Sequence, residues 1–278
     1  MNYKKVNYNS VLAHFLIIIF TFISLFPIVW MFIIALKSPG ESISGFSSIW
    51  ISNPTFRNFV NIFDKIPIWS SMFNSFFTTL MGLITTLFFC SLAGYGFAKY
   101  KFPGRDFLFY FVIATLLIPP EVGAIPLFII MRKLNLINSL WSVIIPKAAT
   151  AIGIFYMRQY IIDVPEEILE SARIDGASEF GIYYKLILPI IKPALATWAL
   201  LVVIARWNSF FWPLIFLRKT AKHTLMVSIS LLPVSEGLST PWTVIMAGTT
   251  FAIVPVIVVF LLLQKYQKAG MTTGSVKG

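Results

Sequence analysis

The stretch Glu170-Ser171-Ala172-Arg173-Ile174-Asp175-Gly176 is followed after nine residues by Leu186-Ile187-Leu188-Pro189, and together they interrupt an otherwise very apolar chain. The interruption carries acidic and basic side chains and lies between two stretches of membrane length. An ordered, charged element between two spans offers a docking surface. We therefore expect a soluble partner to act on the chain at this point.

Local signals predict two short helices in this region. Pro165 suits the first turn of a helix, and the acids that follow it favour a helix N-terminus. Asp175-Gly176 is a turn signal, and Ser178-Glu179 can begin a second helix. The sequence thus predicts a helix-turn-helix over residues 159–190, which we call the polar segment.

The composition places most of the chain in lipid. Of its 278 residues 58% are hydrophobic and 12% are charged, whereas soluble domains carry about 25% charged residues. The net charge is +11, but the basic residues are scattered singly and form no patch that would bind nucleic acid. An anionic membrane surface explains the sign better. Cys90, the single cysteine, cannot form an internal disulfide.

Hydropathy predicts an all-α membrane protein with six transmembrane helices in a single domain over residues 1–278. A spanning helix needs roughly 20 apolar residues. Three runs meet this without a charge, and three more each contain one ionisable residue. The first run is too long for a cleaved signal peptide and is expected to remain as an anchor. The expected spans are about 11–36, 70–98, 107–131, 138–157, 193–217 and 243–264.

Charge asymmetry predicts the orientation. Six spans put both termini on one side, and basic residues are more frequent in the segments that then face the cytoplasm. The short loop with Lys99, Lys101 and Arg105 is the clearest indication. We expect cytoplasmic N- and C-termini, a cytoplasmic polar segment between spans four and five, and outer loops at residues 38–69 and 218–241.

The polar segment resembles the E-A-A-x3-G-x9-I-x-L-P signature of ABC-importer permeases. Glu170, Ala172, Gly176, Leu188 and Pro189 match it, while Ser171 and Leu186 are small departures. The phrase from Ala172 to Ala177 is similar to the maltose-type, carbohydrate-uptake branch. Further matches extend over nearly the whole chain: Ile118-Pro119, Trp207-Asn208, Trp212-Pro213-Leu214 and Gly274 to Gly278.

This resemblance implies a transport subunit of a bacterial cell membrane importer for a sugar or oligosaccharide. It implies a heterodimer with a second homologous permease, an ABC ATPase dimer, and an extracytoplasmic solute-binding protein. ATP and Mg²⁺ would bind the ATPase, and this chain would bind no cofactor or metal. The residues that would couple to the ATPase are Glu170, Ala172, Asp175, Gly176, Leu188 and Pro189.

The residues themselves support a docking role. Ile168, Leu169, Ala172 and Leu186 would give the polar segment an apolar knob with charged flanks, which suits a groove on a partner. The alternative is a surface helix lying among lipid headgroups. Its acids would then face an anionic leaflet, which argues against that arrangement.

Two other function classes are less well supported. A secondary transporter driven by an ion gradient needs intramembrane acids, and Glu121 is the clear candidate, but the two halves of the chain show no inverted repeat. An intramembrane enzyme would need a motif such as H-E-x-x-H or G-x-S-x-G, and neither is present. The chain also lacks a P-loop, so ATP hydrolysis must come from another polypeptide.

Three ionisable residues fall inside predicted spans at a similar depth: Glu121, Lys147 and Arg206. They are candidates for a polar belt that lines the substrate path. A buried ion-pair cluster is the equal alternative, and a third is that the helices end early at nearby prolines, leaving the charges at the interface. Trp207 and Asn208 add an aromatic face and an amide, which suit sugar binding, although Trp is also a common interfacial anchor.

Overall fold

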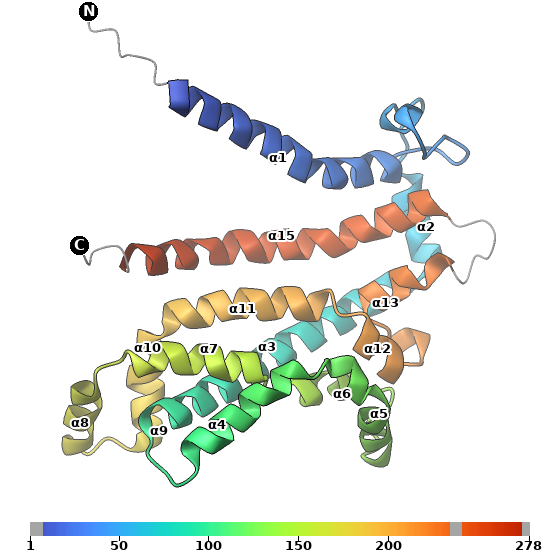
Figure 1. Cartoon of the computed structure of the whole chain (residues 1–278). Coiled ribbons are helices and arrows are strands. Elements are labelled where there is room, and N and C mark those ends of the chain that lie inside the picture. Colours follow the sequence, from blue (N-terminus) through green and yellow to red (C-terminus); the bar gives the residue numbers. More distant parts are fainter. Residues whose placement is uncertain (1–7, 234–240, 274–278) are drawn as a thin grey trace, which may run out of the picture. The chain divides into compact units, whose positions relative to one another are not determined.

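The computed structural model describes residues 8–233 and 241–273, and every regular element among them is a helix (Figure 1). The chain divides into two compact units. The first comprises Met1–Ile66 and Ile229–Ile253, and the second comprises Pro67–Ser228 and Val254–Gly278.

The first unit contains α1 (Tyr8–Ala35), the short 3-10 helix Phe46–Ile49, α2 (Arg57–Lys65) and the first part of α15 (Trp242–Thr273). The described side chains of α1 are mostly apolar and are exposed along most of the helix, which is the pattern of a lipid-facing span. Helix α2 packs on α15 through aromatic edges. Phe59 and Phe63 meet Phe251 with ring centroids 6.0 and 5.8 Å apart.

The second unit is built around α3 (Ile68–Lys99), a helix of 32 residues that packs against α7 (Ala151–Ile162) and α11 (Lys192–Trp207) (Figure 1). Their shared core includes Cys90, Met157 and Trp198. The helices α3 and α7 approach closely at Gly94. A Cβ there would lie 2.7 Å from the Cβ of Met157, closer than real atoms come, so only glycine allows this packing.

Small polar residues near the N-terminal end of α3 hold the segment 218–228 of the same unit. This segment contains the 3-10 helix Thr220–Lys222 and the first part of α13 (Leu225–Ser230). The Asn74 amide donates to the carbonyls of Ala221 and His223 at 3.0 Å each. The hydroxyls of Ser71 and Ser228 share a hydrogen bond of 2.8 Å. These three buried side chains are thus paired, as a low-dielectric interior favours, whereas the buried Thr224 hydroxyl of the same segment has no hydrogen-bond partner.

Three helices are long and apolar enough to cross a membrane by length and composition: Leu12–Ala35, Ile68–Lys99 and Trp242–Leu262. Two further pairs of helices pass the same test together but are bent at a break. The described part of the chain is therefore an all-helical membrane protein with three to five candidate spans. Six transmembrane helices therefore remain a prediction beyond the three to five spans that length and composition support.

The predicted span 107–131 is divided. It consists of α4 (Arg105–Ala114), the 3-10 turns Thr115–Leu117 and Pro120–Gly123, and α5 (Ala124–Lys133), and its two parts are bent by 95°. The break falls at Ile118-Pro119, where both residues have extended ψ angles. Proline lacks the N–H of the helical ladder and disfavours a helical residue before it, so the sequence of two prolines ends the helix.

The predicted spans 138–157 and 193–217 are also interrupted. The former divides into α6 (Trp141–Ile144), the turn Ile145–Lys147 and α7, with Thr150 in extended conformation as the N-cap of α7. The latter divides into α11 and α12 (Phe211–Phe216). Apolar composition gives the length available for a span, but Pro146 and the cap at Asn208 show that it does not guarantee one unbroken helix.

Candidate functional site

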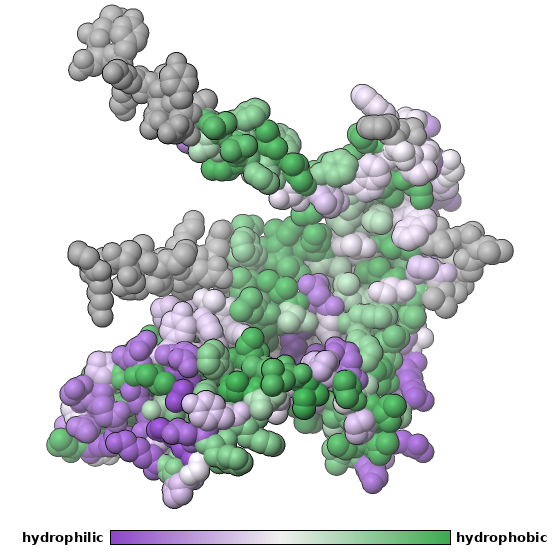
Figure 2. Space-filling model, in the orientation of Figure 1, coloured by the Kyte–Doolittle hydropathy of each residue, from purple (hydrophilic) through white to green (hydrophobic). Residues whose placement is uncertain are grey.

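The polar segment folds as two helices and a turn, close to the prediction. Helix α8 (Glu166–Ile174) follows Pro165, and α9 (Glu179–Ile182) follows Ser178, whose hydroxyl accepts the N–H of Gly181 at 3.2 Å. A π-helical turn (Tyr183–Ile187) and α10 (Leu188–Ile190) continue the chain into α11 across a bend of 79°. Figure 2 shows that hydrophilic residues gather over α8 and α9.

The turn between α8 and α9 depends on Gly176, which has φ +79°. The N–H of Ala177 bonds to the carbonyl of Ala172, and the N–H of Gly176 bonds to that of Arg173, each at 3.0 Å. This is the Schellman arrangement, which closes the last carbonyls of a helix and needs a left-handed residue. A Cβ at Gly176 would meet nothing within 4 Å, so the requirement is one of backbone conformation alone.

Apolar side chains fix the polar segment to the body of the second unit. Leu169, Ile182 and Ile187 are each fully buried, and the Tyr183 hydroxyl shares a hydrogen bond of 2.7 Å with that of Ser91 on α3. Leu169 was expected in the docking knob, but it packs inside its own unit because α8 turns that face inward.

The apolar residues that the polar segment leaves open are different ones. Ile174 is 86% exposed, Phe180 is 60% exposed and Ile168 is 41% exposed. Among the expected coupling residues, Glu170, Asp175, Gly176 and Pro189 are exposed, whereas Ala172 and Leu188 pack partly against the core. The exposed apolar surface therefore follows the end of α8 and the start of α9.

A set of polar contacts, which we call the carboxylate ring, joins the polar segment to the C-terminal end of α3. The Glu179 carboxylate accepts from Arg173 Nε at 2.9 Å through Oε1 and from the Tyr100 hydroxyl through Oε2. Arg173 Nη1 donates to Glu166 at 3.2 Å, and Lys99 Nζ lies 3.7 Å from the other oxygen of Glu166. Five residues from α3, its C-cap, α8 and α9 are thus connected.

Arg173 and Tyr100 set the electrostatics of the carboxylate ring. The guanidinium of Arg173 and then the hydroxyl of Tyr100 lower the pKa of Glu179, because both donate to its charged form. Desolvation, and then the hydrogen bond to Glu179, raise the pKa of the Tyr100 hydroxyl. Sequence analysis missed the ring because Tyr100 lies 79 positions from Glu179; the unlike charges at 173 and 179 were its visible signal.

Arg206 does not take part in the ion-pair cluster that was one of the alternatives for the three charges. Among the described residues, which include all three intramembrane charges, no salt bridge joins Glu121, Lys147 and Arg206. The Arg206 guanidinium instead donates to the carbonyl of Val143 at 3.1 Å, to the Thr86 hydroxyl at 3.0 Å and to the carbonyl of Lys147.

The position of Arg206 explains these partners. Its carbonyl acceptors lie where Pro146 interrupts the helical ladder, and non-helical backbone in a membrane must find donors inside the protein. Gly82 on α3 makes room for the guanidinium, since a Cβ there would be 3.0 Å from its central carbon. Arg206 thus holds neighbouring helices together through backbone carbonyls and the Thr86 hydroxyl. Neither the polar belt nor the ion-pair cluster anticipated this role.

Lys147 and the surroundings of Glu121 border a cleft of about 370 Å³ in the second unit. The Lys147 ammonium lies 5.8 Å from the ring centroid of Trp212, a cation–π distance. Pro120 and Gly123, on either side of the exposed Glu121, line the same cleft. The helical part before Glu121 ends at Leu117, ahead of Pro119 and Pro120, as one part of the third sequence interpretation expected.

Trp207 and Asn208 separate in the structure. Trp207 is 5% exposed and borders an apolar cleft of about 600 Å³ together with residues of α3 and of the part 254–262. Asn208 is exposed and caps α11, its N–H bonding to the carbonyl of Ile204 at 3.1 Å. The two side chains therefore lie in different surroundings, Trp207 at the apolar cleft and Asn208 at the exposed end of α11.

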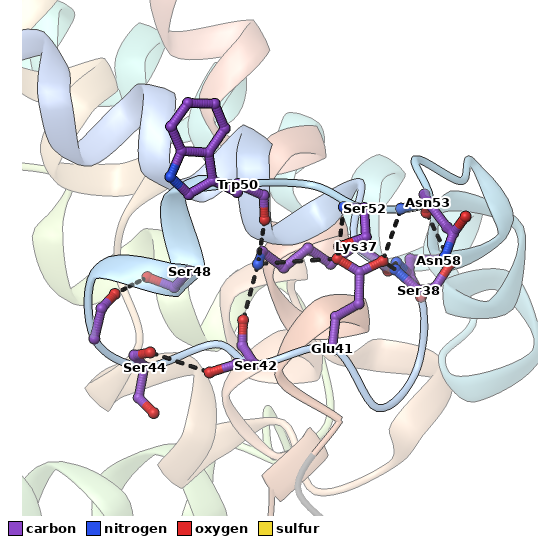
Figure 3. A network of polar contacts seen from close by, with 11 residues as sticks. Lys37, Ser38, Glu41, Ser42, Ser44, Ser48, Trp50, Ser52, Asn53 and Asn58 are labelled. Atoms are coloured by element: carbon purple, nitrogen blue, oxygen red, sulfur yellow. Dashed lines mark hydrogen bonds and ion pairs between the residues drawn. The ribbon is translucent and has the colours of Figure 1, made fainter.

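A buried lysine organises the loop after α1, in an arrangement that we call the lysine clasp (Figure 3). Lys37 is 1% exposed, and its ammonium donates to the carbonyls of Ser42 and Trp50 at 2.8 Å each. Glu41 lies 4.0 Å from the ammonium and accepts the N–H groups of Ser52 and Asn53 at 3.2 Å each.

Asn58 completes the lysine clasp by donating to the carbonyls of Ala35 and Lys37 at 2.8 and 2.7 Å. Desolvation raises the pKa of Glu41, but the backbone hydrogen bonds from Ser52, Ser38 and Asn53 and the charge of Lys37 together outweigh it, so the pKa is lowered overall. Lys37 directly follows the predicted span 11–36, and only this position after an apolar run could have indicated a buried role.

The chain combines apolar helices, several of them interrupted at prolines, with a charged helix-turn-helix that is held by the carboxylate ring. This combination is that of the membrane-spanning subunit of a transporter. The chain belongs to the family of binding-protein-dependent transport system inner membrane components, whose pattern matches residues 87–273. It is a permease subunit of an ABC importer complex and a multi-pass protein of the bacterial inner membrane, and it is not itself catalytic.

Named relatives and a solved structure agree with this assignment. The arabinooligosaccharides transport system permease protein AraQ of Halalkalibacterium halodurans is 36% identical over 260 residues, 92% of each chain. The lactose transport system permease protein LacG of Rhizobium radiobacter is 31% identical over 256 residues, again 92% of each. A chain from the crystal structure of a bacterial ABC transporter that imports the acidic polysaccharide alginate matches with a TM-score of 0.82 and 29% identity, over 96% of this chain and 99% of that one.

Proposed function

We propose that this permease forms half of the translocation path for a sugar or oligosaccharide and receives its energy through the polar segment. The observation that carries the proposal is the exposed apolar surface of Ile168, Ile174 and Phe180 on a rigid, charged helix-turn-helix. An apolar knob with charged flanks suits a groove on an ATPase. A difference in binding between the open and closed ATPase would then shift the permease between states.

The substrate class rests on the named relatives. They are designated for arabinooligosaccharides and lactose, and the solved structure for alginate. All three are carbohydrates. In this chain the cleft beside Lys147 and Trp212 combines a cation with an aromatic face, a combination that suits a sugar ring with polar substituents.

The assembly proposed here has a second homologous permease as a heterodimer partner, two ATPase subunits that hold ATP and Mg²⁺, and an extracytoplasmic solute-binding protein. The chain would cross the membrane six times, with α4–α5, α6–α7 and α11–α12 as broken spans. Both termini and the polar segment would be cytoplasmic, and the lysine clasp would face outside. An enclosed path needs the second permease, because a single set of six spans cannot surround it.

The test is uptake by cells that express the whole importer, with labelled arabinotriose, lactose and an alginate trisaccharide as probes. We expect accumulation of at least one probe, which stops when ATP is depleted while the proton gradient is intact. The Ile174→Ser variant should reach the membrane at normal abundance, bind the ATPase more weakly and lose uptake. Uptake that survives ATP depletion and stops when the proton gradient is collapsed would favour a secondary transporter instead.

A further inference from the structure

The carboxylate ring connects two parts of the molecule that have different roles in transport. We propose that Glu179 is a positioning residue that locks the polar segment to the C-terminal end of α3, so that both move as one rigid piece when the ATPase displaces the segment. This inference rests on the proposed docking of the polar segment on an ATPase. It adds the route by which that displacement enters the membrane part.

The geometry of Glu179 suits a bridge. Its Oε1 accepts from Arg173 Nε at 2.9 Å, which closes the turn within the polar segment. Its Oε2 accepts from the Tyr100 hydroxyl and from the Tyr95 hydroxyl at 3.3 Å, which belong to the end of α3 and its C-cap. One carboxylate therefore serves both parts through charge-assisted hydrogen bonds, which are stronger than neutral ones.

A second polar connection runs parallel to the first. Lys99, the last residue of α3, donates to the carbonyls of Ile162 and Val164 just before α8, and its ammonium lies 3.7 Å from Glu166. Arg173 joins Glu166 to Glu179 and so links the two connections. The polar segment is thus attached to the end of α3 at two separate places, through Glu179 on α9 and through Lys99 near the start of α8. Two attachments prevent the segment from rotating about either one.

Helix α3 can carry a displacement over a long distance. It has 32 residues and no proline, which gives a length of about 48 Å. Its middle contacts Arg206 through Thr86, beside the cleft of Lys147. Its N-terminal part holds the segment 218–228 through Asn74. The bent pair α4–α5 offers no such continuous element.

The ionisation state is consistent with this role, because the pKa of Glu179 is lowered and the side chain is a carboxylate at neutral pH. Its acceptor oxygens are therefore available to Arg173 and Tyr100 under the conditions of transport.

The experiment measures sugar uptake per ATP hydrolysed by the complete importer, together with co-purification of the ATPase. The variants are Glu179→Ala and the double variant Tyr95→Phe/Tyr100→Phe, which breaks the bridge but leaves the bond from Arg173. We expect the complex to assemble and hydrolyse ATP, while uptake per ATP falls about tenfold, as the loss of a charge-assisted bond allows. Uptake per ATP within twofold of the parent in both variants would overturn the proposal, and so would a fall in abundance with an unchanged ratio.

A cross-link gives the second, independent readout. Tyr100→Cys/Glu179→Cys, joined by a short bismaleimide with the fully buried Cys90 left in place, should recover uptake per ATP that the unlinked variant lacks. If the linked protein stays inactive, the two parts must move relative to each other and the proposal fails.

Two controls separate this proposal from the docking function. Asp106→Asn removes an ion pair of the same 2.9 Å length. Asp106 pairs with its chain neighbour Arg105 and connects no two elements, so sugar uptake per ATP should not change in this variant. Ile174→Ser tests docking itself and should lower ATPase binding, which the Glu179 variants should keep. If the Glu179 variants lose uptake per ATP while Ile174→Ser still binds the ATPase normally, the docking surface is refuted and the role of Glu179 as a bridge is retained.

Discussion

Substitution of Gly176 offers a graded test of the turn in the polar segment. Because a Cβ there meets nothing within 4 Å and φ is +79°, the cost comes from backbone conformation and not from a clash within the chain. Asn visits the left-handed region with little penalty, Ala costs about 1–2 kcal/mol there, and a β-branched Val costs more. A cost of 1–2 kcal/mol lowers the population of the turn about 5- to 30-fold.

The assay is uptake by the complete importer together with pull-down of the ATPase, normalised to permease abundance in the membrane. We expect activity to fall in the order Gly, Asn, Ala, Val, with Gly176→Val inactive although inserted. If docking were limited by space at this exposed position, the order would follow side-chain size, and Ala would exceed Asn. That order, or an Ala variant as active as the parent, would refute the conformational reasoning.

Three further results are expected. Arg206→Leu removes the donors from the Val143 carbonyl and should lower stability by about 1–3 kcal/mol, measured by thermal unfolding in detergent, with Arg206→Lys intermediate; an unchanged midpoint in the Leu variant would contradict the structural role. Lys37→Met should make the loop after α1 sensitive to protease added outside, whereas equal protection would exclude the lysine clasp. Folding lowers the pKa values of Glu179 and Glu41, so both carboxylates contribute stability above about pH 4.3, the ordinary Glu value, and lose it as the pH falls through the folded pKa. Sugar uptake per ATP should therefore be constant from about pH 6 to 8. A loss of coupling within that window would contradict the role of these carboxylates.

Local signals in the sequence predicted the polar segment well. Pro165, the acids after it and Asp175-Gly176 each determine backbone conformation within a few residues, and the structure has α8, the left-handed turn and α9 at those places. The long apolar runs likewise became α3 and α15. These features depend on neighbours in the chain or on composition alone, so a single sequence contains what is needed.

Features that depend on distant contacts were not predictable in the same way. An ion-pair cluster was one alternative for Arg206 because three charges fall at a similar depth, but a guanidinium can also be satisfied by carbonyls, and the break at Pro146 supplied them. The carboxylate ring required knowing that Tyr100 would lie beside Glu179. Sequence reasoning located the unusual residues, and the packing of helices decided their partners.

The lysine clasp also has a consequence for the order of biogenesis. Its bonds from the Lys37 ammonium span 5 and 13 positions, and those from Asn58 span 21 and 23. Contacts this local form quickly, and N-terminal parts of a chain fold first during synthesis. The bond between Ser71 and Ser228 spans 157 positions and must wait for most of the polypeptide to emerge from the ribosome. The loop after α1 can therefore form its hydrogen bonds while the later helices of the chain are still being synthesised.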